Sequence, residues 1–140
     1  MYQILGLDHL VLRSENPARL VAFYRDVLGC TVERESSPAF GLIQLRAGSS
    51  LIDIVEINSE LGRSGGDAPR QTGHNMDHFC LRLAEFNEEE LRQHLSAHGI
   101  KASQFGRRYG ATGFGQSIYI DDPDGNTVEL KAPVDNETDD

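Results

Sequence analysis

The sequence predicts an α+β protein made of two tandem βαβββ modules. A strand-like segment with a central histidine occurs twice, as LDHLVLR at residues 7–13 and as MDHFCLR at residues 76–82. Each copy is followed by a segment with helical periodicity and then by segments with strand-like alternation. Each half also ends in an apolar–carboxylate–apolar pattern, centred on Asp53 in the first half and on Glu129 in the second. These observations indicate a duplicated unit.

The first module follows the order strand, helix and three strands. After the histidine strand, ENPARLVAFYRDVLGC at residues 15–30 carries apolar side chains at helical spacing, and Gly29 is placed to end the helix. A turn, AGSS, separates the last two strands. The three predicted strands are TVERE at 31–35, AFGLIQLR at 39–46 and SSLIDIVEI at 49–57.

The second module repeats this order. Its first strand is NMDHFCLRL, and the helix NEEELRQHLSAHG has Asn87 as its N-cap, Glu90 three residues later and Gly99 as its stop. The DPDG sequence at residues 122–125 predicts a turn before the last strand. The three predicted strands are IKASQF at 100–105, QSIYID at 116–121 and NTVELKA at 126–132.

The chain is long enough for one domain, which we place at residues 1–134. Its two modules span about residues 5–60 and 74–132. The Gly-rich and polar stretch LGRSGGDAPRQTGHN at 61–75 connects them. The acidic end DNETDD at 135–140 is predicted to be a disordered tail.

Strand alternation predicts which side chains share a face. One face of the histidine strands carries His9, Val11 and Arg13 and, in the second copy, His78, Cys80 and Arg82. The opposite face is more consistently apolar, so we expect it to pack against the helix. Asp53 and Glu129 also point away from the apolar face. Two imidazoles and two carboxylates around one cavity suit Zn, Ni, Co, Fe or Mn, with coordination positions left for substrate.

Composition excludes several other functions. The net charge is −9 and the sequence has no basic stripe, which argues against nucleic acid or an anionic membrane as a partner. No apolar run approaches the length of a membrane span, and the N-terminal sequence does not resemble a signal peptide. Cys30 and Cys80 are far apart and form no C-x-x-C motif. We therefore expect reduced thiols and a cytoplasmic location.

The sequence resembles the vicinal oxygen chelate superfamily over roughly residues 5–132. The resemblance is carried by LDHLVLR, AFYRDVLGC, MDHFCLRL and, most specifically, IYIDDPDGNTVELK. The superfamily includes glyoxalase I, extradiol dioxygenases, fosfomycin-resistance transferases and bleomycin-binding proteins. Membership implies that the two βαβββ modules form a cupped mixed sheet with a metal ion inside.

The resemblance also implies ligands for one divalent metal ion, either Zn, Ni, Co, Mn or Fe. His9, Asp53, His78 and Glu129 match the four ligand positions, and Glu129 or Asp53 would be the catalytic base. Asp53 stands where glyoxalases carry a glutamate, and its side chain is one methylene shorter. If it stops short of the metal, the remaining ligands form the two-histidine, one-carboxylate set of Fe(II) oxygenases.

Substrate-binding residues follow from the same resemblance. Arg13 stands where glyoxalase I carries an arginine that contacts the glutathione carboxylate. The segment GRRYGATGFGQ at residues 106–116 resembles a loop that closes over the cup, although a plain β-turn connection is the alternative. Within this segment Arg107, Arg108 and Tyr109 are candidates to hold an anionic substrate.

The sequence thus favours a divalent-metal enzyme of the glyoxalase type. Its reaction would resemble that of lactoylglutathione lyase, with proton transfer through an enediolate of a small substrate that offers two adjacent oxygens. One alternative is an Fe(II)-dependent extradiol dioxygenase that uses His9, His78 and Glu129. Another is a metal-free drug-binding or metabolite-binding resistance protein. The resemblance further implies a homodimer.

Overall fold

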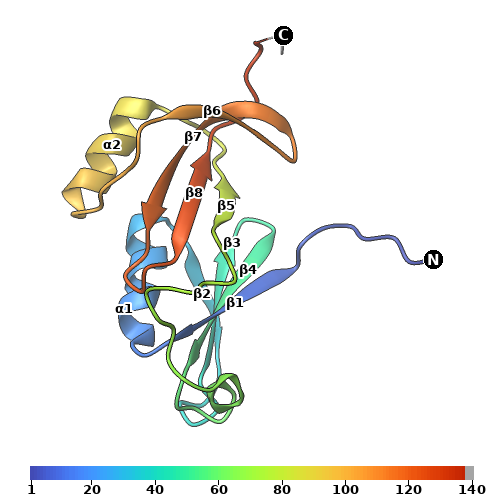
Figure 1. The fold of residues 1–140 in the computed structure, drawn as a ribbon, viewed down its shortest axis with the longest axis vertical. Coiled ribbons are helices and arrows are strands. Elements are labelled where there is room, and N and C mark those ends of the chain that lie inside the picture. The colour runs from blue at the N-terminus through green and yellow to red at the C-terminus, as the bar shows by residue number, and fades with distance from the viewer. Residues whose placement is uncertain (138–140) are drawn as a thin grey trace. The chain divides into compact units, whose positions relative to one another are not determined.

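The computed structural model describes residues 1–137, and the chain separates into two compact units, Met1–Gln71 and Thr72–Asp140. Each unit contains a four-stranded mixed sheet and one main helical segment (Figure 1). The order of elements along each unit is strand, helix and three strands. This confirms the predicted α+β class and the two-module organisation.

In the first unit the sheet has the order β1-β4-β3-β2. The first and last strands are parallel neighbours, and β3 is antiparallel to both β4 and β2. This arrangement brings the histidine strand directly beside the carboxylate strand. The strands are β1 (His9–Ser14), β2 (Thr31–Glu35), β3 (Leu42–Ala47) and β4 (Ser50–Glu56).

The predicted first helix is present as α1 (Pro17–Ala22), which continues into the π-helical turn η1 (Phe23–Val27). The Asn16 side chain accepts a hydrogen bond from the backbone N–H of Arg19, 3.2 Å away. This bond satisfies one of the donors that every helix start leaves unpaired. Gly29 ends the segment with a φ of 78°, a conformation that glycine adopts without strain.

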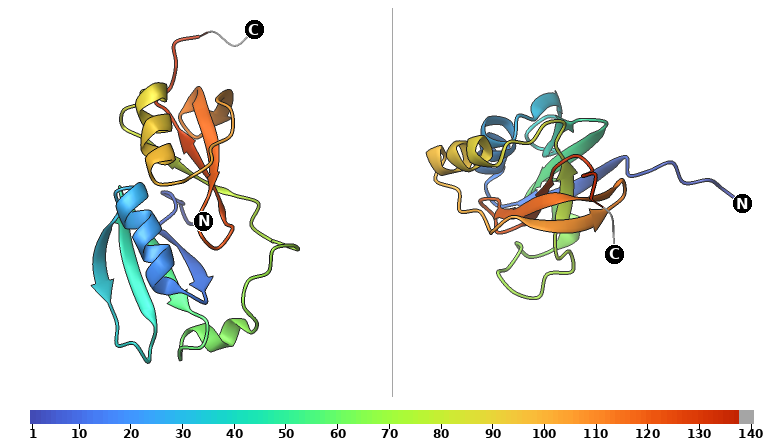
Figure 2. Two further views of the ribbon diagram at one scale, coloured as in Figure 1. Left: turned by 90° about the vertical axis from the view of Figure 1, so that its left-hand side faces the viewer. Right: turned by 90° about the horizontal axis from the view of Figure 1, so that it is seen from above.

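The core of the first unit lies between this helical segment and one face of the sheet (Figure 2). Alternation along β1 leaves Leu12 buried and His9 exposed, which agrees with the predicted faces. The largest fully buried side chains of this unit are Leu20, Tyr24, Leu45, Ile52 and Ile54.

The second unit repeats the topology with the order β5-β8-β7-β6. The first strand is again parallel to the last, and the remaining pairs are antiparallel. Helix α2 (Glu88–Ala97) begins after Asn87, whose side chain accepts a hydrogen bond from the Glu90 backbone N–H at 3.0 Å. The strands are β5 (Phe79–Arg82), β6 (Gly106–Gly110), β7 (Gly113–Asp121) and β8 (Thr127–Lys131).

Two local predictions in this unit are wrong. Residues 100–105 form no strand, because β6 starts only at Gly106 and takes the pairing with β7. Segment 106–116 is not a loop: β6 and the start of β7 form an antiparallel hairpin within it. The antiparallel pairing within residues 106–116 agrees with the alternative prediction for this segment, a plain β-turn connection.

The predicted disordered tail is also partly ordered. The Asp135 backbone N–H donates to the Phe114 carbonyl at 2.9 Å, and the Asp135 carboxylate pairs with Arg107. These contacts fix residue 135 against the β6–β7 hairpin. The rest of the predicted tail from residue 138 onward lies outside the described residues. Within residues 1–137, no helix combines the length and the apolar character needed to cross a bilayer.

Candidate metal centre

The register of the first sheet places the predicted carboxylate on the face of the predicted histidine. Val11 pairs with Asp53 across the parallel β1–β4 ladder, and His9 is two residues before Val11. Side chains paired across a ladder share a face, and so do side chains two residues apart. Asp53 and His9 therefore lie on the same face, opposite the buried Leu12.

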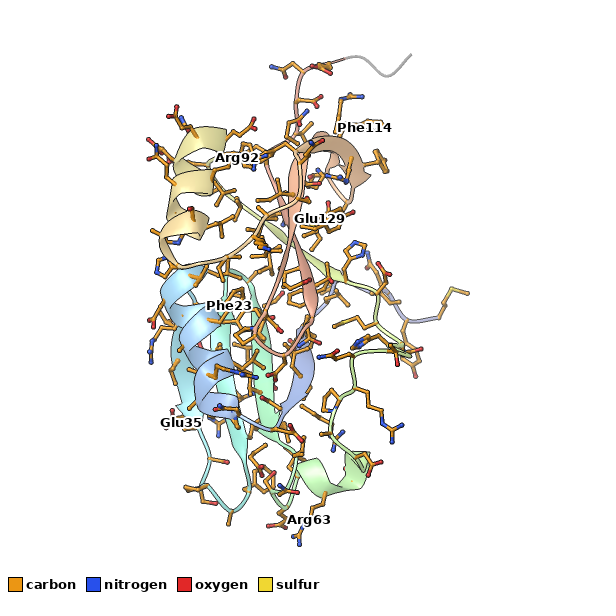
Figure 3. The ribbon with its side chains drawn as sticks, turned by 60° about the vertical axis from the view of Figure 1, so that its left-hand side comes forward. Phe23, Glu35, Arg63, Arg92, Phe114 and Glu129 are labelled. Carbon is orange, nitrogen blue, oxygen red and sulfur yellow. The ribbon has the colours of Figure 1, made fainter. Side chains whose placement is uncertain are left out.

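The second sheet repeats this arrangement. Glu129 pairs with Cys80 on one side and with Tyr119 on the other, so all three share a face. His78 is two residues before Cys80 and lies just ahead of β5. Glu129 itself lies in the middle of the sheet on β8 (Figure 3).

Each histidine is held by the aspartate that precedes it. Nδ1 of His9 lies 2.7 Å from Oδ2 of Asp8, and Nδ1 of His78 lies 2.7 Å from Oδ2 of Asp77. A carboxylate accepts, so Nδ1 carries the proton and Nε2 is the nitrogen left to bind a metal. This is the carboxylate–histidine arrangement that orients imidazole ligands in metal sites. The repeated Asp–His dipeptide was the sequence signal for it, although strand alternation alone assigns the aspartates to the other face.

In the second unit the histidine and the carboxylate are in direct contact. Nε2 of His78 lies 3.2 Å from Oε1 of Glu129. Glu129 is only 6% exposed, so its charge sits in a site from which water is largely excluded. Two metal-ligating atoms of the types that zinc and iron accept are thus brought together by one sheet.

In the first unit the carboxylate has a different partner. Asp53 is 4% exposed, and the Gln44 side-chain amide donates to its two oxygens at 3.3 and 3.2 Å. The hydrogen bond to Asp8 raises the pKa of His9, and the charge of Asp53 adds to the increase. Asp53 therefore acts on His9 through its charge.

The surroundings of Glu129 include a phenol and a thiol. Partial burial and then the Glu129 charge raise the pKa of Tyr119. Burial of the sulfur and then Glu129 raise the pKa of Cys80 to about 11. Both groups are therefore protonated at neutral pH. The raised pKa argues against Cys80 as a nucleophile, although the residue is exposed.

Each unit by itself offers two donor groups of the kinds that divalent metal ions bind, one imidazole and one carboxylate. Within residues 1–137 no cluster of three or more histidine, cysteine, aspartate or glutamate side chains is positioned to hold an ion. Each unit instead contributes one imidazole, whose Nε2 is oriented outward from its aspartate, and one buried carboxylate. Nitrogen and oxygen donors in this ratio are the ligand types that open catalytic sites use.

Arg13 is engaged by the segment that follows β4. Its Nε and Nη2 donate to the Gly62 carbonyl at 3.3 and 3.0 Å, and Nη1 donates to the Asp67 carbonyl at 2.9 Å. Nη2 also donates to the Gly66 carbonyl. The short 3₁₀ helix η2 (Gly62–Gly65) packs so closely that a Cβ on Gly65 would collide with this guanidinium. Most N–H donors of Arg13 are thus used in hydrogen bonds to backbone carbonyls of residues 62–67.

The structure separates the two neighbouring arginines of β6. Arg107 pairs with Gln116 and Tyr109 with Phe114, which places both on the face opposite Glu129. The Arg107 guanidinium forms an ion pair with Asp135 at 2.9 Å and stacks on Phe114, with 4.1 Å to the ring centroid.

Arg108 lies on the other face of the same strand. Its guanidinium lies over the ring of Tyr119, 4.6 Å from the centroid, on the side that carries Glu129. The structure therefore places Arg108 on the face of the predicted ligand Glu129. It places the other two candidates, Arg107 and Tyr109, on the opposite face. Sequence alternation gives this result only once the start of β6 is known.

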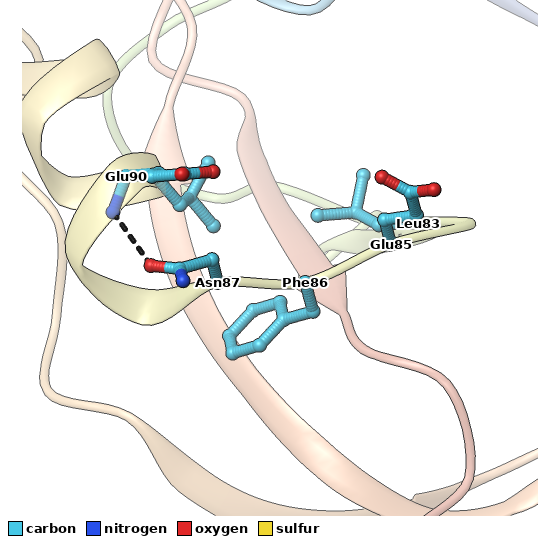
Figure 4. A pocket seen from close by; sticks show the side chains of 6 residues that line it. Leu83, Glu85, Phe86, Asn87 and Glu90 are labelled. Atoms are coloured by element: carbon cyan, nitrogen blue, oxygen red, sulfur yellow. Dashed lines mark hydrogen bonds between the residues drawn. The ribbon is translucent and has the colours of Figure 1, made fainter.

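A separate pocket of about 350 Å³ lies at the start of α2 (Figure 4). It contains none of the predicted ligands. Its lining residues are Leu83, Glu85, Phe86, Asn87, Glu90 and Leu91. The hydrogen bond from Glu90 to Asn87 that caps the helix runs along its wall.

Known proteins with the same fold support the duplicated arrangement. A sequence model described as the Glyoxalase/Bleomycin resistance protein/Dioxygenase superfamily matches residues 6–130. An integron cassette protein from the mobile metagenome of V. cholerae is 25% identical with a TM-score of 0.75, over 95% of this chain and 98% of that chain. A virulence protein from Salmonella typhimurium is 27% identical with a TM-score of 0.75, over 95% and 100%. A lactoylglutathione lyase from Agrobacterium tumefaciens shares the fold at 23% identity, with a TM-score of 0.67, over 94% and 96%.

Proposed function

The chain belongs to the glyoxalase/bleomycin resistance protein/dioxygenase superfamily, and from this premise we propose that it is a divalent-metal-dependent enzyme of the glyoxalase type. The reaction is a proton transfer on a small substrate that offers two adjacent oxygens. The fold shared with a lactoylglutathione lyase is compatible with this proposal. A homodimer in the cytoplasm belongs to the same proposal.

The observation that carries the proposal is the repeated geometry of the histidines. In both units an aspartate holds Nδ1 at 2.7 Å, and the freed Nε2 is on the face of a buried carboxylate. A histidine with a purely structural role does not need its ring held in this orientation. A metal ligand does, because its ring must present one nitrogen in a fixed direction.

The proposed ligands are His9 and Asp53 of the first unit and His78 and Glu129 of the second. A bound divalent ion would supply a Lewis acid that stabilises negative charge on the substrate oxygens. Glu129 is the proposed base, which would move a proton between the two carbons of the substrate. It is the longer of the two carboxylates and lies in a site of low water content. Asp53 is the alternative base.

Tyr119 positions the proposed base. Its hydroxyl stays protonated at neutral pH, because partial burial and the Glu129 charge raise its pKa, and the two residues are direct partners in the β7–β8 ladder. The ring of His78 meets the Tyr119 ring edge-on, with the centroids 5.2 Å apart. The proposed base thus has Tyr119 as its neighbour on β7 and is contacted by the His78 ring.

A second candidate function is favoured by the surroundings of Asp53. Both of its oxygens accept from Gln44, so part of its bonding capacity is already used. Without Asp53 the ligands are His9, His78 and Glu129, the set that Fe(II) oxygenases employ. The corresponding reaction is oxygen-dependent cleavage of a catechol ring.

Metal content tests these proposals directly. Elemental mass spectrometry is applied to the native protein, and again after reconstitution, for the wild type, His78→Ala and Asp53→Ala. His98→Ala is the matched control, because His98 is the residue that follows α2 and its Nδ1 contacts the His94 carbonyl. Circular dichroism confirms that each variant is folded.

Stoichiometric Zn, Ni or Co that is lost in both site variants and kept in the control supports the glyoxalase-type site, and hemithioacetals are then the first substrates to assay. Iron that survives in Asp53→Ala and is lost in His78→Ala favours the dioxygenase, and catechols under oxygen are assayed instead. A wild-type protein that takes up no metal even on reconstitution contradicts both and leaves the metal-free binding protein.

A further inference from the structure

We propose that Arg108 is an anion-binding residue of this site, so that the substrate carries a carboxylate or a similar anionic group besides its two chelating oxygens. This inference rests on the proposed function, because it places the anionic group relative to the proposed ligands. It assigns the recognition role to Arg108 and not to its neighbour Arg107.

The Arg108 side chain is fixed in place before any ligand arrives. Nη1 donates to the carbonyl of Ser117 at 2.7 Å and to the Ser117 hydroxyl at 3.0 Å. The planar guanidinium lies over the Tyr119 ring at 4.6 Å, where the cation is attracted by the negative face of the ring. A half-buried arginine held in this way loses little conformational entropy when it binds an anion.

The remaining donors of Arg108 have no acid partner. Within residues 1–137 all of its hydrogen bonds come from Nη1, and no carboxylate forms an ion pair with it. Two other arginines contrast with it, because Arg107 pairs with Asp135 and Arg46 pairs with Glu33. The Nε and Nη2 donors of Arg108 are parallel and adjacent, which is the geometry that binds a carboxylate through both oxygens.

Tyr119 connects Arg108 to the proposed ligands. The His78 ring lies 5.2 Å from the same Tyr119 ring, and Glu129 is the ladder partner of Tyr119. A substrate with its chelating oxygens beside His78 and Glu129 would therefore reach Arg108 across one aromatic ring.

The charges on this face decide whether an anionic group can bind there. Glu129 is buried on it, and the chain as a whole carries a net charge of −9, so an anion needs a local cation here. Lys131 lies two residues after Glu129 on the same strand, but it is 3% exposed and its Nζ donates to the Gly113 carbonyl at 2.8 Å. Lys131 adds positive potential, and Arg82 lies on the same face at the end of β5. Arg108 is the cation of this face whose guanidinium is held over Tyr119 with Nε and Nη2 left to donate.

The test compares two chelating probes that differ by one charge. Acetohydroxamate offers two adjacent oxygens and no further charge, and succinic acid monohydroxamate offers the same chelating group with a carboxylate at its other end. Binding to cobalt-loaded protein is measured at pH 7.5 by calorimetry, and the visible Co(II) spectrum reports chelation separately. The proteins are wild type, Arg108→Gln, Arg108→Lys and the neighbouring Arg107→Gln.

We expect the wild type to bind the carboxylate probe about tenfold more tightly than the neutral one, as one charge-assisted pair would give. Arg108→Gln should lose this advantage and keep its affinity for acetohydroxamate. Arg108→Lys should keep part of it, and Arg107→Gln should keep all of it. The spectral change on chelation should be the same in all four proteins.

Three outcomes overturn the inference while leaving the proposed function intact. They are a wild type with no preference for the carboxylate probe, an Arg108→Gln protein that retains the preference, and an Arg107→Gln protein that loses it equally. If neither probe changes the Co(II) spectrum of the wild type, the proposed function itself is contradicted. The inference depends on that function and is then overturned as well.

Discussion

Nε2 of His78 lies 3.2 Å from Oε1 of Glu129, although most of the second unit separates the two residues along the chain. The contact arises because β5 and β8, the first and last strands of the unit, are parallel neighbours. The same pairing of first and last strands brings His9 to the face of Asp53 in the first unit. The βαβββ order therefore builds one histidine–carboxylate pair per unit.

Loss of the aspartate behind a histidine should weaken metal binding. Asp77→Asn keeps the shape of the side chain but removes the charge that holds His78 Nδ1 at 2.7 Å. We expect roughly 10- to 100-fold lower metal affinity, as is typical for outer-shell partners of histidine ligands. A competition titration with a chelator at pH 8 measures it.

Asp67→Asn is the control for that experiment, because its carboxylate forms only a surface pair with Arg70. It should leave metal affinity unchanged. Equal affinities for Asp77→Asn and wild type would show that the aspartate does not orient the histidine.

The pKa of His9 should depend on Asp8. The hydrogen bond from Nδ1–H to Asp8 raises this pKa above its ordinary value of 6.5, and the Asp53 charge adds to the effect. Asp8→Asn should therefore lower it, as an NMR titration of the imidazole protons in metal-free protein would measure. Because the folded-state pKa is the higher one, the stability linked to His9 is present at low pH and disappears as the pH rises through that pKa. An unchanged or higher pKa in Asp8→Asn would contradict the assigned bond.

Glu129 should suppress the reactivity of Cys80. Burial and then the Glu129 charge raise the pKa of this thiol to about 11, so roughly 0.1% is thiolate at pH 8. Glu129→Gln removes one cause of the increase, and the alkylation rate of Cys80 by iodoacetamide should rise several-fold. Peptide mass spectrometry separates Cys80 from the buried Cys30.

Glu85→Gln changes an acid elsewhere in the same unit and should leave that alkylation rate unchanged. A rate that does not respond to Glu129→Gln would mean that Cys80 and Glu129 are not neighbours.

Arg13 should stabilise the segment that follows β4. Its guanidinium donates to the carbonyls of Gly62, Gly66 and Asp67. Arg13→Gln removes most of these bonds, so cleavage within residues 62–70 by a protease should become faster. Arg46→Gln, which loses only the ion pair to Glu33, should be cleaved at the wild-type rate.

A substrate role for Arg13 would be detected in the same variant. Once a substrate is in hand, an unchanged KM in Arg13→Gln assigns Arg13 to the scaffold alone. A wild-type cleavage rate together with a raised KM would reverse that assignment.

Asn87 should stabilise α2 through its cap. The Asn87 side chain accepts from the Glu90 N–H at 3.0 Å, so Asn87→Ala leaves that donor unpaired and should lower the free energy of unfolding by about 1 kcal/mol. Urea unfolding followed by far-ultraviolet circular dichroism measures the change. Asn87→Asp keeps an acceptor at the positive end of the helix and should be at least as stable as wild type. Equal losses in both variants would show that the cap contributes nothing.

The duplication and the faces of the main strands could be predicted from the sequence. Apolar and polar residues alternate with a period of two in strands, so the buried Leu12 and the exposed His9 follow from pattern alone. The caps at Asn87 and Gly99 were likewise local signals, because a helix end is decided by its neighbouring residues. All of these features depend on residues close together in the chain.

Contacts between distant segments depended on the tertiary structure. The face of Arg108 depends on where β6 begins, and a shift of one residue exchanges Arg108 with Arg107. The carbonyls that occupy Arg13 and the contact between His78 and Glu129 arise from segments far apart in sequence. The sequence by itself determined the fold class, the repeat and the candidate ligands, because periodicity and repetition are local. The tertiary structure decided which side chains meet, because strand register is a property of the paired chains.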